Sequence, residues 1–198
     1  DAKVCGLGEK ALSSWFMGRT ETALQHMDAA EDWARHIDHV GSTCHALDIG
    51  IMLHRYRGDI DKVAQFARKM RATAPEHDPK SPEAKSLIFG GWANGMAGDP
   101  ARGREILAQG LSIQQEIGTE EDFPVYLEMA AELDGQLGKH ADGIALVSSA
   151  IERAEAAGHA FWLAELYRAD LTEIAHSEFS PQAAMIARKS IENNEQYR

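Results

Sequence analysis

Residues 97–103 have the sequence Ala-Gly-Asp-Pro-Ala-Arg-Gly, and this phrase decides the fold because its glycine recurs at a fixed interval. Related phrases place a glycine every 40 residues, at Gly18, Gly58, Gly98 and Gly138. A second set of helix-ending residues has the same spacing: Asp38, Asp78, Gly118 and Gly158. Glycine commonly ends a helix, Asp caps the start of one, and proline is tolerated in the first turn. Each unit therefore contains two helix ends, which predicts a repeated helical hairpin.

The segments between these helix ends carry small and apolar residues at helical spacing. In the segment 20–37 they are Ala23, Met27, Ala30, Ala34 and Ile37, the three-and-four spacing of one helix face. The composition agrees, because the 198 residues include 31 Ala but only 5 Val and 6 Thr, and strands favour β-branched residues. The sequence predicts first helices at 3–17, 41–57, 82–97, 121–137 and 160–176, and second helices at 20–37, 60–74, 100–117, 140–157 and 180–196.

The predicted fold class is all-α, a right-handed α-solenoid of about five helical hairpins that form one domain over residues 1–198. A single hairpin cannot bury its apolar face alone, so neighbouring hairpins must stack. The expected repeats are 1–38, 41–78, 82–118, 121–158 and 160–198.

The hairpin phrase resembles the tetratricopeptide repeat. In that family the turn glycine is followed by a small residue, a large apolar residue and an alanine, at the spacing of Gly18, Ala23, Met27 and Ala30. The copies that begin at residues 58, 98 and 138 match less fully. Small residues are expected where the two helices of a hairpin cross closely. The period of 40 exceeds the usual length of about 34 residues, so HEAT-like repeats remain the structural alternative.

A narrower resemblance rests on residues 160–168, Ala-Phe-Trp-Leu-Ala-Glu-Leu-Tyr-Arg, together with the long period. The chain is similar to the C-terminal helical region of large bacterial signalling proteins, where repeats follow an ATPase module of the AAA/STAND type. The output domain of those proteins is a class III adenylate or guanylate cyclase, or a winged-helix transcriptional regulator. The family phrase has a glycine shortly after Arg168 that this chain lacks. The resemblance implies a sensor or scaffold role and names no catalytic residue.

The first helices of a tetratricopeptide stack line a concave groove, which is where that family binds its partners. Carrying the groove positions onto this chain gives an aromatic and Met-rich half and an acidic half. Met and aromatic side chains bind partner helices adaptably. The alternative is that the aromatic residues only pack between repeats. The groove positions are Trp15, Phe16, Asp48, Met52, Arg55, Tyr56, Lys85, Ile88, Trp92, Met96, Glu128, Glu132, Gln136, Glu165 and Arg168.

The formal net charge of −11 reflects 31 acidic against 20 basic residues. An acidic chain repels phosphate backbones and anionic membrane surfaces, so we expect neither nucleic acid nor membrane as a partner. No apolar run approaches the ~20 residues of a membrane span. Cys5 and Cys44 are too few for a disulfide scaffold and are expected to be two buried thiols in a reducing cytoplasm.

Two polar clusters allow further hypotheses. The residues around His36 and His39, including Asp38 and His45, could form half of a metal site. No third and fourth ligand is evident, so we expect no metal and interpret the cluster as a polar helix end. The acidic cluster Glu116, Glu120, Glu121 and Asp122 could recruit a basic partner, or could be a solvated helix start.

Phosphate-loop, metalloprotease, nucleophile-elbow and dinucleotide motifs are all missing from the sequence. We therefore expect no catalytic residue and no cofactor. The function predicted is a protein-interaction or sensory module that binds a partner peptide or domain in the groove. The alternatives are a stand-alone scaffold or adaptor and a sensor of a small ligand or peptide. The first residue is Asp1 rather than Met, which favours a piece of a longer or processed protein.

Overall fold

The computed structural model describes residues 1–74, 79–120 and 122–176, which contain nine helices and no strand. The first helices of the hairpins are α1 (Ala2–Phe16), α3 (Val40–Tyr56), α5 (Lys80–Met96), α7 (Phe123–Gln136) and α9 (Ala160–His176). The second helices are α2 (Thr20–Ile37), α4 (Ile60–Thr73), α6 (Pro100–Ile117) and α8 (His140–Ala157). The helix predicted at 180–196 lies outside the described residues. The all-α hairpin fold is thus confirmed over the part of the chain that the structure describes.

The helices end where the sequence predicts, to within two residues. The turn glycines at positions 18, 58, 98 and 138 have φ of 74°, 69°, 119° and 73°, a backbone conformation that glycine adopts without a steric cost. After two of these turns a side chain caps the next helix: the carboxylates of Asp59 and Asp99 accept hydrogen bonds from the backbone N–H groups of Lys62 and Arg102. The phrase that recurs every 40 residues therefore encodes the end of one helix, a glycine with positive φ and the start of the next helix.

The two helices of the third hairpin cross at glycines, as the small-residue pattern predicts. A Cβ atom added at Gly91 of α5 would lie 2.7 Å from the carbonyl oxygen of Gly103 in α6. Further along α6, a Cβ atom added at Gly110 would lie 2.7 Å from the carbonyl oxygen of Ala84 in α5. Both distances are too short for a side chain, so the close contact of α5 and α6 requires glycine at these positions.

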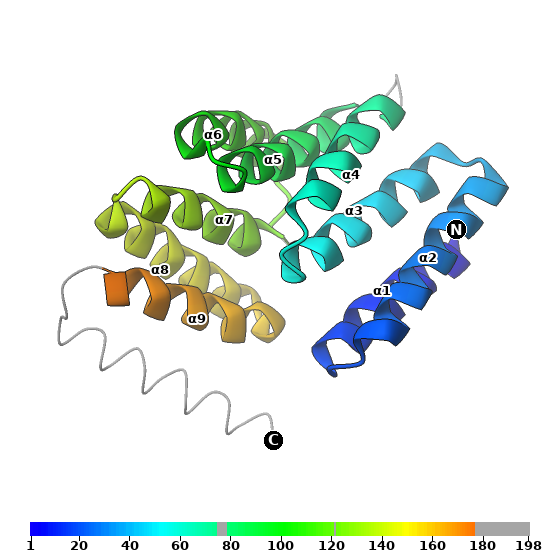
Figure 1. Cartoon of the computed structure of the whole chain (residues 1–198), viewed down its shortest axis with the longest axis horizontal. Helices are drawn as coiled ribbons and strands as arrows, with labels where there is room; N and C mark the ends of the chain where they lie inside the picture. Colours follow the sequence, from blue (N-terminus) through cyan, green and yellow to red (C-terminus); the bar gives the residue numbers. More distant parts are fainter. Residues whose placement is uncertain (75–78, 121, 177–198) are drawn as a thin grey trace.

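First and second helices form an inner and an outer layer. The second helices bury one stripe each, as in α4, where Val63, Phe66, Ala67 and Met70 are buried. The inner helices α3, α5 and α7 are buried on most sides. The hairpins follow an arc in which α1 and α2 stand at one end and α9 at the other (Figure 1). None of the helices in the described ranges is long and apolar enough to cross a membrane.

Candidate functional site

An ion pair between two non-adjacent hairpins occupies the inner side of the arc. The Nη2 atom of Arg55, in α3, lies 2.8 Å from Oε2 of Glu128, in α7, and 3.4 Å from Oε2 of Glu132. The side chains of Arg55 and Glu128 are 3% and 1% exposed. No Cα atom of α3 lies within 8 Å of one in α7. Long polar side chains, rather than backbone contact, therefore connect the second hairpin to the fourth.

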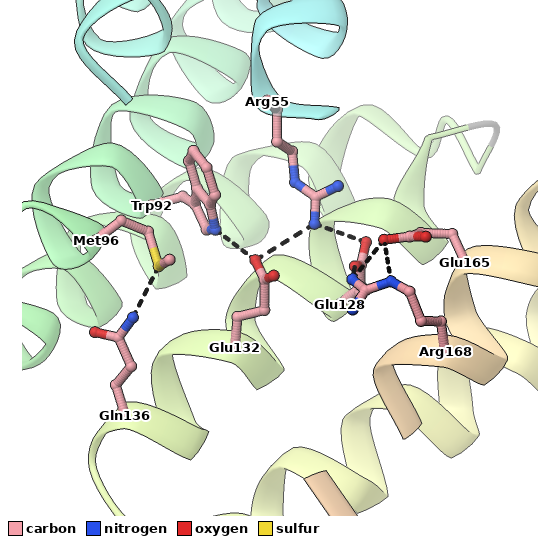
Figure 2. A network of polar contacts seen from close by, with 8 residues as sticks. All are labelled: Arg55, Trp92, Met96, Glu128, Glu132, Gln136, Glu165 and Arg168. Carbon is pink, nitrogen blue, oxygen red and sulfur yellow. Dashed lines mark hydrogen bonds and ion pairs between the residues drawn. The ribbon is translucent and has the colours of Figure 1, made fainter. Parts of the chain in front are cut away.

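Neighbouring inner helices join the same network, which Figure 2 shows. The indole N–H of Trp92 donates to Glu132 over 2.6 Å, and the amide of Gln136 contacts the sulfur of Met96 at 2.9 Å. These two contacts link α5 to α7. From α9, Arg168 lies 2.5 Å from Glu165 and 3.9 Å from the second carboxylate oxygen of Glu128. The network thus reaches from α3 to α9.

Burial controls the ionisation of the central pair. Burial raises the pKa of Glu128, and the Arg55 guanidinium opposes that rise only in part. For Arg55, burial disfavours the charge, but Glu128 and Glu132 outweigh it and raise the guanidinium pKa. Oε1 of Glu128 has no hydrogen-bond partner, and it lies 3.9 Å from Nη2 of Arg168, whose side chain is 55% exposed. Arg55 is therefore the charge on which ionised Glu128 depends.

A cavity of about 690 Å³ lies between the two ends of the arc. One wall comes from α1 and α3, and the facing wall comes from the corner between α8 and α9. No Cα atom of α1 lies within 8 Å of one in α9, so the space is bounded by side chains from distant repeats. Its lining is Glu9, Leu12, Ser13, His45, Asp48, Ile49, Met52, Lys85, Asp122, Gly158, His159 and Trp162.

Lys85 organises the polar part of this cavity. Its ammonium group donates to Asp48 of α3 and, at 3.2 Å, to Asp122 at the start of α7. Burial opposes the charge on Lys85, but the two carboxylates outweigh burial and raise its pKa. Burial also raises the pKa of Asp48, against the influence of Lys85. One cation is thus shared between two carboxylates at the cavity wall.

The structure brings most of the predicted groove residues together in two places. The polar network contains Arg55, Trp92, Met96, Glu128, Glu132, Gln136, Glu165 and Arg168. The cavity contains Asp48, Met52 and Lys85. Their role in binding a partner stays a prediction.

Five of the predicted groove residues are largely hidden in the structure. Met52 is 6% exposed, Arg55 6%, Trp92 3%, Glu128 1% and Ile88 0%. Ile88 and Trp92 belong to the core that packs between repeats, the alternative that the sequence left open for the aromatic residues. A partner could touch Met52 only through the cavity, because so little of its side chain reaches solvent.

The remaining aromatic residues of the predicted groove lie at the ends of α1 and α3, and Tyr56 adjoins the polar network, since the guanidinium carbon of Arg55 lies 5.6 Å from its ring centroid. Trp15 is half-buried against the core of the first two hairpins. Phe16 is 45% exposed, and its ring meets that of Tyr56 edge to face, with centroids 5.1 Å apart. These residues therefore extend the inner surface beyond the network.

The cavity also contains residues that the groove pattern missed, among them Glu9, Leu12, His159 and Trp162. Each lies one turn or more away from the groove positions on its own helix or in a corner between helices. The sequence singles out Asp122 and His45 only as members of an acidic cluster and a histidine cluster. No local signal in the sequence places the first hairpin opposite the α8–α9 corner, because that depends on the curvature of the whole stack.

Two members of the histidine cluster have local structural partners. Nδ1 of His39 accepts a hydrogen bond from the backbone N–H of Ser42 and caps α3. The ring of His36 packs against Trp33, with centroids 5.1 Å apart. Over the described ranges, no group of three or more His, Cys, Asp or Glu side chains could hold a metal ion. Both Cys5 and Cys44 are free thiols. The sequence predicts that they are buried, but both are only half-buried.

The acidic cluster at the start of α7 is largely paired. Glu116 lies 3.7 Å from Lys80, and Glu120 lies 2.7 Å from Arg153. Asp122 is engaged by Lys85. Of the described members of this cluster, none is left as an isolated charge for a basic partner, and only Asp122 faces the cavity.

No protein-family model matches the chain. An uncharacterised protein of Rhizobium meliloti (strain 1021), R02095, is 42% identical over 171 residues, which cover 85% of this chain. The chain spans 16% of the length of that relative. Among solved structures, the crystal structure of the MamA protein aligns over 98% of this chain and 93% of its own, with a TM-score of 0.47 and 11% identity.

Proposed function

We propose that this chain is a non-catalytic interaction module that binds a segment of a partner protein, or another domain of its own polypeptide, on the inner side of the arc. The observation that carries the proposal is the cavity of about 690 Å³ between the two ends of the stack. Binding sites in proteins are typically concave, with apolar walls and a few placed polar groups. This cavity has apolar residues such as Met52 and Trp162 beside the charges of Asp48 and Lys85.

The module is proposed to belong to a larger bacterial signalling protein. The match to a stretch that makes up 16% of R02095 supports a segment within a long polypeptide. The phrase at residues 160–168 supports the signalling context, in which an ATPase and a cyclase or transcriptional regulator would accompany the repeats. Location in the cytoplasm belongs to the same proposal, as does the prediction that neither nucleic acid nor membrane is bound by this segment.

An immunoblot of source-cell lysate with an antibody against this segment tests the context. A band several times heavier than 21.7 kDa is expected. A band near 21.7 kDa would refute the larger polypeptide and leave a free-standing scaffold or adaptor.

Photo-crosslinking in the source cells tests binding on the inner side. A photoreactive amino acid replaces Ser13, which is exposed and lines the cavity, or Gln109, which is exposed on the outer helix α6. Mass spectrometry of the adducts should find one recurrent protein segment joined at position 13 and missing at position 109. Adducts equal at both positions, or confined to position 109, would refute the proposal.

A sensor of a small ligand is the second candidate, and the same cavity favours it, since its volume suits a small molecule. A metabolite that binds the folded state would raise the melting temperature of the isolated chain by an amount that increases with its concentration. A screen of cell extract fractions below about 1 kDa, read as a shift in melting temperature, separates this candidate from a pure scaffold.

A further inference from the structure

We propose that the cavity between α1, α3 and the α8–α9 corner selects a cationic side chain, a lysine or arginine of the bound segment, flanked by apolar residues. This inference rests on the proposed binding of a protein segment and names the chemistry that the site recognises. It starts from the charges that line the cavity. Glu9, Asp48 and Asp122 contribute three carboxylates, against one ammonium group from Lys85.

The ammonium group of Lys85 is already paired. Lys85 is bound by both Asp48 and Asp122, so it offers an incoming anion little free positive charge. Glu9 brings a further carboxylate, from α1. The fixed charge of the cavity is therefore negative, which disfavours an anionic ligand and favours a cation.

The hydrogen-bonding groups point to the same ligand class. Carboxylates only accept hydrogen bonds when ionised, and Lys and Arg side chains only donate them. A ligand whose polar group only donates hydrogen bonds is therefore complementary to the three carboxylates of the lining.

The apolar residues explain why a side chain with a long stem suits the site better than a bare ion. Leu12, Ile49, Met52 and Trp162 share the cavity with the carboxylates. Lys and Arg carry several methylene groups that pack on apolar surface while the charged head stays with polar groups. The volume of about 690 Å³ also leaves room for the residues on either side of the cation.

Three acetylated and amidated tripeptides probe the site: Leu-Lys-Leu, Leu-norleucine-Leu and Leu-Glu-Leu. The readout is the ¹³C-methyl signal of Met52, a cavity residue with 6% exposure, assigned with the variant Met52→Leu. Titration to about 10 mM detects even millimolar affinity. The lysine peptide should shift this signal and bind at least about tenfold more tightly than the norleucine peptide. The glutamate peptide should bind most weakly.

Matched charge reversals test the role of the cavity. Glu9→Lys should lower the affinity for the lysine peptide by about tenfold, since it reverses the charge of a residue that lines the cavity. Glu152→Lys makes the same change at an exposed position of the outer helix α8 and should alter affinity less than about twofold. Both positions are exposed, so both variants should keep the wild-type circular dichroism spectrum.

Three results would overturn the inference: equal affinity for the lysine and norleucine peptides, no shift of Met52 by the lysine peptide, or an equal effect of the two charge reversals. These results are distinct from failure of the proposed function. A recurrent adduct at position 13 whose crosslinked segment lacks Lys and Arg would support binding on the inner side of the arc. It would refute the proposal that the cavity selects a cationic side chain. Selective capture of the lysine peptide with no recurrent adduct would keep the cation site and refute the protein partner.

Discussion

Replacing Arg55 with Met should uncouple the second hairpin from the fourth. The variant keeps a side chain of similar length but removes the guanidinium that lies 2.8 Å from Glu128. Glu128 is then left in a site where its side chain is 1% exposed, with Arg168 at 3.9 Å as its nearest remaining cation. Breaking a buried ion pair in this way costs about 3–5 kcal/mol. Because Arg168 stays nearby, we expect the loss to fall near the lower end, about 3 kcal/mol.

The control is Arg35→Met, which breaks the ion pair with Asp32 on the outer helix α2. That pair has a similar separation, 2.9 Å, but its side chains are 73% and 72% exposed. Exposed pairs contribute about 0–1 kcal/mol, so this variant should lose less than about 1 kcal/mol. The difference between the two variants then reports burial rather than the loss of one positive charge.

Urea unfolding at pH 8, followed by circular dichroism and by tryptophan fluorescence, measures both costs. Two probes are needed because stacked repeats can unfold in more than one step. The double variant Arg55→Met/Glu128→Gln should recover at least about 1 kcal/mol of the loss, since no buried charge is then left unpaired. A loss for Arg55→Met within about 0.5 kcal/mol of that for Arg35→Met would refute the reasoning.

Two further predictions concern buried groups elsewhere. Burial raises the pKa of Asp170 to about 6. Because a carboxyl pKa that is raised on folding makes stability fall as pH rises from about 4 through 6, the carboxylate destabilises the folded chain at neutral pH. Asp170→Asn should therefore raise the melting temperature at pH 7.5 and not at pH 4.5. Gly91→Ala should cost at least about 1–3 kcal/mol in urea unfolding, because its Cβ would lie 2.6 Å from the backbone nitrogen of Leu107. Gly6→Ala meets no atom within 4 Å and should instead stabilise α1 by up to about 1 kcal/mol; a loss at this position, or no loss at Gly91, would contradict the packing argument.

The hairpins were predictable because their signals are local. The phrase Gly98-Asp99-Pro100 ends one helix, caps the next and begins it, using only the φ freedom of glycine, the carboxylate of Asp99 and the fixed φ of proline. The same is true of the small residues at helix crossings, since Gly91 and Gly103 meet inside one hairpin. Neighbouring segments of chain carry all of this information, and it recurs every 40 residues.

The candidate site was predictable only in part. The family pattern assigned Arg55, Glu128 and Glu132 to one face, and they lie together. The pattern gave no indication that Arg55 would cross to the fourth hairpin, or that Glu9 and Trp162 would line one cavity. Those contacts depend on small rotations between successive hairpins that add up along the stack. The sequence by itself thus determined the helices and their pairing, while the tertiary structure decided the curvature and hence which distant side chains meet.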